Sequence, residues 1–551
     1  MISAPYNFVP LSSQVFLPDW SQQVSHDIPF KDGLSGELHY TLTAETPLLV
    51  GGRQTRANND HPGEVRPFKL PDDSYAIPGS SMKGLLRSVM EIAAFGRMNK
   101  VDEVRPGLRD ISKADSVYAT RDLICHTSPV HRQEPGAQHG YDLADLLFGA
   151  INSQNQADAL RGRVSCEIAR AKGQPGPEAQ PPTILNSPKP SYFPNYLTQL
   201  VDSHSWKLRK DKQNQENQQY VTYIRTDASR APTLRGFKRY PVRPLADAQV
   251  QELTDQQRGN RSVQVRLHTL PPQTRFEGRI VFHNLKPVEL GALLWVLTWG
   301  GKAELRHSLG MGKPFGFGQV RIELQADRCR LIPNDPAEPE AALTPERIEQ
   351  LMHAFVQTMT EQIPEWERSP QILNLLAMAN PQSATQLPAG MELRHMRLDS
   401  TQRVNEFQSA KKDKLVLPDY AVATGALDAR SFRPAQGKPC TASQPHAASA
   451  SVSPATTTPA KPVESAFKET KEEWTNVVLT YNKGDRSLKA TAAQQGTATA
   501  NQADADKLLA MLPQEQRDKL KKKGDLKGAQ ATVTIKGNCY TLIHLAWPGT
   551  S

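Results

Sequence analysis

The sequence predicts an α+β protein whose core is a ferredoxin-like unit with the element order βαββαβ, interrupted by insertions and followed by a small β-rich module. Three observations support this prediction. Strand, helix and strand patterns follow one another near the amino terminus, and the same series recurs near residue 300. Beyond a segment that is poor in large apolar residues, a further group of short strand patterns fills the end of the chain.

The first strand is expected over residues 34–50, where apolar and polar residues alternate up to a Gly-Gly pair. A helix is expected over residues 82–96, with Ser80 or Ser81 as its amino-terminal cap. Six apolar side chains recur at helical spacing, so one face of this helix should be buried. They are Met82, Leu85, Leu86, Val89, Met90 and Ala93.

The second half of the unit follows the same logic. A strand is expected over residues 163–170, and a long polar insertion then extends from about 172 to 262. Strand and helix patterns return at 274–285 and 287–297, and a glycine-rich turn leads into a last strand at 319–324. These segments supply the remaining elements of a βαββαβ unit.

Composition divides the chain into four parts. The core with its insertion is expected over 1–330, and a helical then mixed extension over 331–431. Residues 432–465 are rich in Pro, Ala, Ser and Thr, which predicts a disordered linker. Residues 466–551 contain four strand patterns and a helix at 503–512, for which an OB-like barrel is one arrangement.

The charge balance favours a polyanionic partner. Lys and Arg number 66 against 57 Asp and Glu, which gives a formal net charge of +9. No amino-terminal signal and no membrane-spanning apolar run is evident, so a cytoplasmic protein without a membrane partner is expected.

Metal binding is not expected from the cysteines, since five of them are scattered without a CxxC pair. Cys125, His126, His131 and His139 lie close together in the sequence and leave a metal site open as an alternative. Their spacing matches no common zinc pattern, so loop histidines are the simpler interpretation.

The start of the first predicted helix is a candidate phosphate site. Free N–H groups, the small Ser80 and Ser81, and the cations Lys83 and Arg87 on one face suit a nucleic-acid backbone. The alternative is an ordinary solvated helix face.

The glycine-rich turn before the last core strand is a second candidate. Its glycines allow positive φ and close approach to a ligand, while Lys313, Phe315 and Phe317 suit phosphate and base. Lys313 is not followed by Ser or Thr, which excludes a P-loop, and a strand follows where a dinucleotide fingerprint needs a helix. The glycines are Gly310, Gly312, Gly316 and Gly318.

The stretch from Trp206 to Tyr240 interleaves cations with aromatics, a mixture typical of single-strand binding. A solvated, charged insertion explains the same composition equally well.

Six segments between residues 34 and 330 together resemble the RAMP (repeat-associated mysterious protein) superfamily, in particular the backbone subunits of CRISPR type III effector complexes. The resemblance implies an RRM-like core that binds guide RNA, meets target RNA, and assembles with other effector subunits in antiviral defence. The segments are TPLLVGG, YAIPGSSMKGLLRSVMEIA, DLLFG, RGRVSCEIARA, FEGRIVFHNLKPVELGALLWVL and LGMGKPFGFGQVRIEL.

The resemblance also implies site roles. Lys83 and Arg87 would contact guide phosphates, and the turn from Gly310 to Gly318 would line the same RNA groove. An Asp after the Gly-Gly pair is needed for target cleavage in type III relatives, and Asp60 is the matching candidate, with Asp72 and Asp73 as rivals. Such an Asp would orient or deprotonate the attacking 2′-hydroxyl, with Mg²⁺ or another divalent metal ion as a potential cofactor.

Two other functions stay open. One is a non-catalytic, structural RNA-binding subunit, and the other is an endoribonuclease that processes precursor guide RNA. The second activity usually needs a His or Tyr near the glycine-rich loop, and His307 is the candidate.

Overall fold

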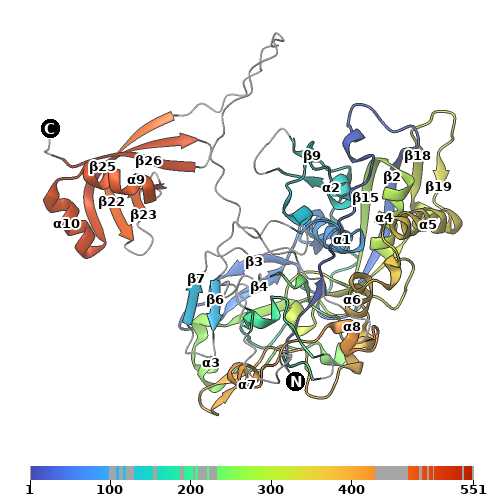
Figure 1. Ribbon diagram of the computed structural model, residues 1–551, viewed down its shortest axis with the longest axis horizontal. Coiled ribbons are helices and arrows are strands. Elements are labelled where there is room, and N and C mark those ends of the chain that lie inside the picture. The colour runs from blue at the N-terminus through green and yellow to red at the C-terminus, as the bar shows by residue number, and fades with distance from the viewer. Residues whose placement is uncertain are drawn as a thin grey trace, which may run out of the picture. The chain divides into compact units, whose positions relative to one another are not determined.

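The structure is a computed structural model of the chain, and it divides into two compact units, Met1–Pro445 and His446–Ser551 (Figure 1). Each unit is described by itself. The residues that the structure describes are 2–98, 107–110, 116–119, 129–152, 158–185, 192–202, 205–208, 220–221, 233–428, 470–482, 487–492, 496–500, 502–536 and 539–548. The predicted linker, 432–465, lies outside them.

A nine-stranded sheet forms the centre of the first unit, and its strand pairs are antiparallel. The order β17-β2-β15-β10 agrees with a βαββαβ unit whose first and third strands are central, and the α+β class is confirmed. The strands are β2 (Leu34–Ala44), β5 (Ala76–Ile77), β10 (Val164–Cys166), β11 (Ala169–Ala171), β15 (Arg275–Leu285), β16 (His307–Ser308), β17 (Gln319–Leu324), β18 (Arg330–Pro333) and β19 (Ala341–Ala342).

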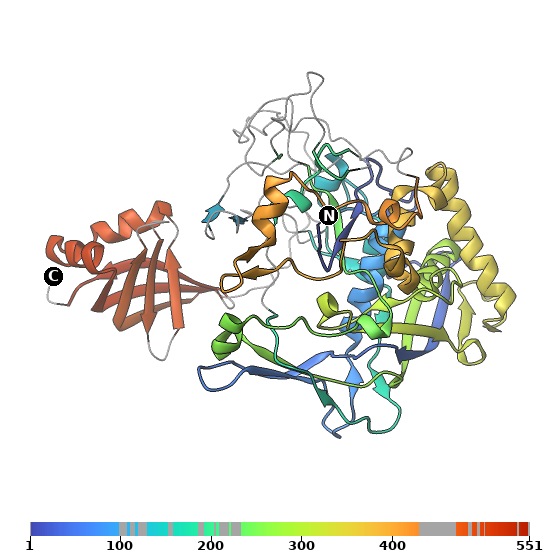
Figure 2. The same ribbon diagram turned by 90° about the horizontal axis from the view of Figure 1, so that it is seen from below.

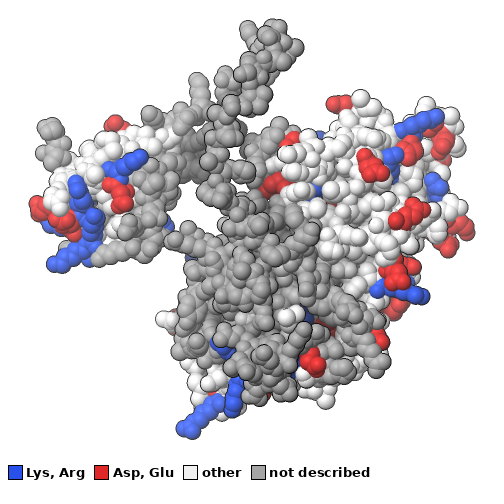
Figure 3. All heavy atoms as spheres, viewed as in Figure 1, with Lys and Arg blue, Asp and Glu red and all other residues white. Residues whose placement is uncertain are grey.

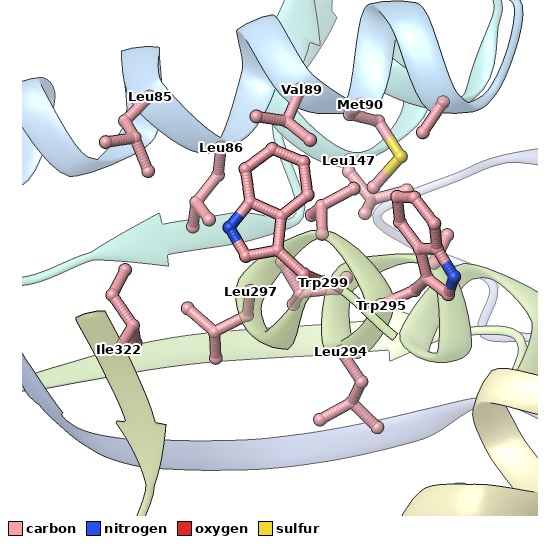
Figure 4. Close-up of a cluster of buried hydrophobic side chains, with 14 of the residues drawn as sticks. Leu85, Leu86, Val89, Met90, Leu147, Leu294, Trp295, Leu297, Trp299 and Ile322 are labelled. Carbon is pink, nitrogen blue, oxygen red and sulfur yellow. The ribbon is translucent and has the colours of Figure 1, made fainter. Parts of the chain in front are cut away.

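Helices α1 (Gly79–Ala93) and α4 (Pro287–Thr298) pack together against this sheet. The apolar face predicted for α1 is buried, and Figure 4 shows its Leu86 and Val89 facing Trp299 at the end of α4. Because nine consecutive residues of α4 are buried, that helix lies inside the core rather than on its surface.

Helix α1 begins earlier than predicted. Pro78 is its N-cap without a side-chain hydrogen bond, so the predicted caps Ser80 and Ser81 lie in the first turn instead. The start is fixed by packing, because a Cβ on Gly79 would lie 2.0 Å from the carbonyl oxygen of Cys166. Only glycine permits this contact between the helix and β10.

Strand β15 alternates as predicted, with Phe276, Ile280 and Phe282 buried on one face. Gly278 lies on the same face, and a side chain is excluded there because a Cβ would be 2.3 Å from the Tyr40 ring. The strand predicted at 163–170 is divided into β10 and β11, both of which pair with β15.

A fully buried ion pair joins Arg163, just before β10, to Glu289 at the start of α4. Arg163 Nη1 donates to Glu289 Oε2 over 2.9 Å, and the same carboxylate accepts from the backbone N–H of Lys286 (2.8 Å) and from Trp20 Nε1 (3.2 Å). Further hydrogen bonds from Arg163 reach the carbonyl oxygens of Leu146 and Asn284. Each charge is therefore compensated within the core.

A second sheet, with the order β12-β14-β4-β3, projects the hairpin that contains Asp60. Figure 2 shows this hairpin, in blue, along the lower edge of the first unit. The strands are β3 (Gly51–Thr55), β4 (Gly63–Pro67), β12 (Glu178–Ala179) and β14 (Val265–Thr269).

The insertion and the extension pack on each other and on the amino-terminal segment. Strand β1 (Asn7–Pro10) pairs with β13 (Gly236–Arg239), and residues from all three segments share one apolar cluster that includes Tyr6, Tyr192 and Phe407. The other elements are α2 (Leu143–Phe148), α3 (Asp255–Gly259), α5 (Pro345–Gln362), α6 (Pro370–Ala379), α7 (Glu406–Lys412), α8 (Tyr420–Ala423), β6 (Gly107–Asp110), β7 (Ser116–Ala119), β8 (Gly149–Ala150), β9 (Leu160–Arg161), β20 (Leu398–Asp399) and β21 (Val404–Asn405).

The second unit is a closed five-stranded barrel in the order β22-β23-β24-β26-β25. Its apolar core includes the fully buried Trp474. The four predicted strands and the predicted helix are present, whereas β24 and α10 were not predicted. The elements are β22 (Thr470–Asn482), β23 (Ser487–Ala492), β24 (Gly496–Ala500), α9 (Gln502–Ala510), α10 (Gln514–Lys523), β25 (Asp525–Lys536) and β26 (Cys539–Ala546).

Candidate nucleic-acid interface

The glycine-rich loop adopts the backbone that its sequence predicts. All four glycines have positive φ, between 75° and 80°. A Cβ on Gly318 would lie 1.8 Å from the carbonyl oxygen of Leu309, and one on Gly310 would lie 2.3 Å from that of Leu49. The loop is therefore folded tightly against neighbouring backbone at positions where only glycine fits.

The two aromatic residues of this loop do not face a ligand. Phe315 is 3% exposed and Phe317 is 1% exposed, in a cluster with Leu49, Val65 and Leu267. The prediction that they stack on bases is wrong for this structure, because their rings anchor the loop to the strands beneath it.

A groove of about 1020 Å³ lies beside the loop, between three segments that are distant in the sequence. One wall is the loop itself from Gly310 to Phe315, a second comes from the insertion, and a third is the extension over 394–402. Arg243 joins these walls, since its guanidinium donates to the carbonyl oxygens of Leu393 (2.7 Å) and Pro314 (2.9 Å).

Two lysines in this groove lack an acidic partner. Among the residues that the structure describes, no carboxylate lies within 4 Å of the Lys238 or Lys313 ammonium groups. Burial lowers the pKa of Lys238 to about 8. Burial, together with the nearby charge of Arg239, also lowers the pKa of Lys313 to about 8. Both cations are therefore destabilised by their surroundings.

Lys238 is held by tyrosines instead of by an acid. Its Nζ lies 4.1 Å from the ring centroid of Tyr6, 5.3 Å from that of Tyr196 and 5.5 Å from that of Tyr240. It also donates a hydrogen bond of 3.0 Å to the Tyr196 hydroxyl. Ring faces attract the ammonium group, but they do not neutralise its charge.

The groove contains only part of the predicted site. Gly310, Gly312 and Lys313 line it, whereas Gly316 and Gly318 shape the loop from behind. The residues predicted on the first helix and on the hairpin do not line it. They are Ser80, Ser81, Lys83, Arg87 and Asp60.

The two cations of α1 differ in their partners. Arg87 pairs with Glu91 (2.8 Å) and Asp145 (2.9 Å), and it donates to the carbonyl oxygen of Gly149 (2.6 Å). Lys83 has no carboxylate within 4 Å among the described residues. Lys83 is therefore available to an outside anion, while Arg87 stabilises the contact between α1 and α2.

Asp60 is exposed at the tip of the β3–β4 hairpin. The side-chain oxygen of Asn58 accepts from the backbone N–H groups of Asp60 (2.9 Å) and His61 (2.8 Å), and Arg261 donates to the Asp60 carbonyl oxygen (2.6 Å). These contacts order the backbone and leave the Asp60 carboxylate without an ion-pair partner among the described residues.

The rival carboxylates are both paired. Asp72 accepts from Ser74 and from Arg170 (2.8 Å), contacts that lower its pKa to about 2. Asp73 pairs with Lys69 over 3.2 Å. Of these three carboxylates, only that of Asp60 has no ion-pair partner among the described residues.

Sequence comparison identifies the family. The model of the RAMP superfamily matches residues 41–321, just over half of the chain. The chain belongs to the RAMP superfamily. The matched region spans the sheet from β2 to β17, the Asp60 hairpin and the glycine-rich loop of this RAMP chain. No curated protein matches the sequence.

Two solved structures are similar to this RAMP chain at low identity. A chain of a structure titled "Type IV-B CRISPR Complex" is 16% identical, with a TM-score of 0.24, and the match covers 53% of this chain and 91% of that one. Csc2 of Thermofilum pendens is 12% identical, with a TM-score of 0.22, and the match covers 67% and 87% respectively. Similarities at this level do not establish a shared function.

His307 is enclosed in the RAMP chain. It is 1% exposed, stacks on Trp299 with ring centroids 4.5 Å apart, and lies 3.1 Å from the carbonyl oxygen of Leu297. Burial lowers its pKa to about 3, so the ring is neutral at physiological pH. A buried neutral imidazole has no route to an RNA substrate in this conformation.

Only part of the alternative metal site formed by Cys125, His126, His131 and His139 lies within the described residues. Cys125 and His126 lie outside the described residues, while the two ring nitrogens of His131 contact the backbone of Met98 (3.1 Å) and Ser12 (3.0 Å). Within the described parts of the chain, no three His, Cys, Asp or Glu side chains are grouped to hold a metal ion. In the same parts, no helix has the length and apolarity to cross a membrane.

The aromatic stretch of the insertion is also partly internal. Trp206 is 8% exposed and Tyr220 is 6% exposed, so neither ring is free to stack on a base. Sequence reasoning included Lys238 and Tyr240 in this stretch but missed Tyr6 and Tyr196. An alternation of aromatic residues at the amino terminus was the available signal, yet it did not reveal the β1–β13 pairing.

Proposed function

We propose that this RAMP chain is the RNA-binding backbone subunit of a CRISPR type III effector complex and that guide RNA occupies the groove beside the glycine-rich loop. Family membership, the net charge of +9 and the composition of the groove support this proposal. Target RNA and other effector subunits are then its further partners.

The unpaired lysines of the groove carry the proposal. Holding two half-buried cations with no carboxylate within 4 Å among the described residues costs free energy, and the lowered pKa values of Lys238 and Lys313 reflect that cost. A phosphate backbone supplies the missing negative charge, and counterions are released when it binds. The backbone of Gly310 and Gly312 lines the groove beside Lys313.

Guide binding tests this role directly. The Lys238→Gln/Lys313→Gln double variant should raise the Kd for a labelled guide RNA about tenfold or more, and it should reduce the slope of log Kd against log salt by about 1–2. Fluorescence anisotropy at several salt concentrations measures both. Lys302→Gln is the matched control, because Lys302 is exposed, does not line the groove and has no ion-pair partner among the described residues. An unchanged Kd and salt slope in the double variant would remove the groove from the RNA path.

We also propose that Asp60 supplies a target-RNA cleavage site. Its exposed, unpaired carboxylate on a hairpin tip is free to meet a scissile phosphate, unlike those of Asp72 and Asp73. The other carboxylate of the described hairpin, Glu64, pairs with Arg66 and His268, so RNA phosphates and water would complete the coordination of a divalent ion such as Mg²⁺ at Asp60.

Cleavage mapping in the reconstituted effector complex tests Asp60. Asp60→Ala should remove one cut in a labelled target RNA while guide binding persists, and Asp73→Ala should leave the cut pattern intact. If Asp60→Ala cuts normally, the chain is the structural, non-catalytic alternative. Incubating the purified chain with repeat RNA separately tests precursor processing, which the enclosed position of His307 disfavours.

A further inference from the structure

The strands of the second unit form a closed barrel with a recognisable order. Strand β22 pairs with both β23 and β25, while β24 and β26 are parallel neighbours. Two helices, α9 and α10, lie between the third and fourth strands of the chain order. This is the strand order of OB-type barrels, which commonly bind oligonucleotides on their outer surface. Topology alone does not assign a function, so the surface itself has to be considered.

Exposed lysines without acidic partners gather on this barrel. Lys489 of β23, Lys521 and Lys522 of α10, and Lys527 of β25 are exposed, and none has a carboxylate within 4 Å among the described residues. Lys519 differs, because it pairs with Glu515 over 2.7 Å. Figure 3 shows Lys and Arg side chains gathered over α10.

The strand register relates Lys489 to the start of β25, the strand that follows α10. Thr480 of β22 pairs with Lys489 on one neighbouring strand and with Asp525 on the other. Two strand spacings, about 10 Å, therefore separate the backbones of Lys489 and Asp525. The carbonyl oxygen of Gly524 accepts from the backbone N–H of Tyr481 (2.8 Å), which holds the end of α10 against the end of β22.

Tyr481 belongs to the interior of the barrel rather than to this surface. It pairs with the buried Leu488, and its side chain packs against the apolar core. The surface therefore offers spaced cations, which track the phosphate backbone of a single strand. The lysine surface is defined as Lys489, Lys521, Lys522 and Lys527.

We propose that the lysine surface binds single-stranded nucleic acid and is a second site, separate from the groove of the first unit. The groove accounts for none of these residues, and the barrel has its own apolar core. RNA and DNA share the phosphates that this surface recognises, so either strand fits. The competing explanation is that Lys521 and Lys522 only compensate the negative end of the α10 dipole.

Binding by the full-length chain tests the second site. In a Lys238→Gln/Lys313→Gln background, which weakens the groove, residual binding of labelled U20 RNA and dT20 DNA should persist. Adding Lys521→Glu and Lys522→Glu should weaken that residual binding at least tenfold. Lys507→Glu is the matched control, because Lys507 is also an exposed lysine in the last turn of a helix, α9.

The outcomes separate the explanations. Equal loss for U20 and dT20 supports recognition of phosphates, whereas loss for U20 alone narrows the ligand to RNA. A lowered melting temperature with unchanged affinity would assign the lysines to the helix dipole and overturn the proposal.

Crosslinking gives a readout that does not depend on charge reversal. Photo-crosslinking of wild-type protein to 4-thiouridine RNA and to 5-iododeoxyuridine DNA, followed by peptide mapping, should identify peptides of the barrel that carry the lysine surface. Crosslinks confined to residues 2–428 would overturn the second site. That result would leave the role of the groove intact, and crosslinks confined to the barrel would do the reverse.

Discussion

Buried positive charge occurs in two forms in the first unit. Arg163 is fully buried and fully compensated, with Glu289 and two carbonyl oxygens as partners. Lys238 and Lys313 are half-buried and have no carboxylate near them among the described residues. A compensated charge serves the fold, whereas an uncompensated one weakens the fold until an anion arrives. The contrast separates structural cations from candidate binding cations without reference to sequence motifs.

The largest expected effect is on the compensated pair. Glu289→Ala leaves Arg163 buried without its partner, and it should lower the free energy of unfolding by about 3–5 kcal/mol. Urea unfolding followed by circular dichroism measures the loss. The Lys238→Gln/Lys313→Gln variant should lose no stability in the same assay. A loss comparable to that of Glu289→Ala would show that the lysines of the groove stabilise the fold as Arg163 does.

A smaller effect separates the two cations of α1. Arg87→Ala removes contacts to Glu91, Asp145 and the carbonyl oxygen of Gly149, and it should cost about 1–3 kcal/mol of unfolding free energy. Burial and the neighbouring Asp142 raise the pKa of Asp145, so that carboxyl depends on the arginine for its charge. Lys83→Ala should change stability by less than about 0.5 kcal/mol. Equal costs in thermal unfolding would place both residues in the structural class.

Lys83 is expected to affect RNA binding rather than stability. As an unpaired cation at the start of α1, it should contribute to RNA affinity and to its salt dependence. Lys83→Glu is expected to raise the Kd for guide RNA severalfold and to flatten the salt slope, as measured by anisotropy. An unaltered slope would exclude Lys83 from the RNA path.

The smallest effect is a pH dependence with opposite signs for stability and binding. In RNA-free protein, the folded pKa values of Lys238 and Lys313 are about 8, against an ordinary value of about 10.4. The unfolded chain therefore binds more protons between those values, and stability should rise with pH across that window. RNA binding needs the protonated lysines, so affinity should fall severalfold as pH rises through 8.

Arginine variants isolate this effect. Lys238→Arg/Lys313→Arg keeps the positive charges at every pH in that range, so its RNA affinity should vary less with pH than that of the wild type. Parallel titrations of both proteins by anisotropy, at fixed ionic strength, provide the measurement. Identical pH profiles would show that the lysines of the groove do not titrate on binding.

Local sequence patterns predicted the elements whose information is local. The buried faces of α1 and β15, and the positive φ of the glycine-rich loop, follow from residue spacing and from the residue type. Strand β24 was missed because its sequence contains Gly, Thr and Ala but no large apolar residue. Its place in the barrel comes from pairing with β23 and β26.

The site was harder to predict because its parts are distant in the sequence. Arg87 was expected to be free, yet its partner Asp145 is 58 residues away. Phe315 and Phe317 suggested stacking, but a cluster that includes Leu49 and Leu267 encloses their rings. Lys238 was noticed for its charge, whereas its tyrosine contacts depend on the pairing of β1 with β13.

The β1–β13 pairing also imposes an order on the folding of the groove. Asn7 can pair with Arg239 only after Arg239 has left the ribosome, and residues 394–402, which form a wall of the groove, are synthesised later. Contacts with such large sequence separation form slowly, because closing long loops costs entropy before the contacts repay it. The groove is therefore expected to be completed late in translation, after the central sheet has its strands. Until then, Tyr6 and its apolar neighbours remain without their packing partners, an interval in which a nascent chain is exposed to aggregation.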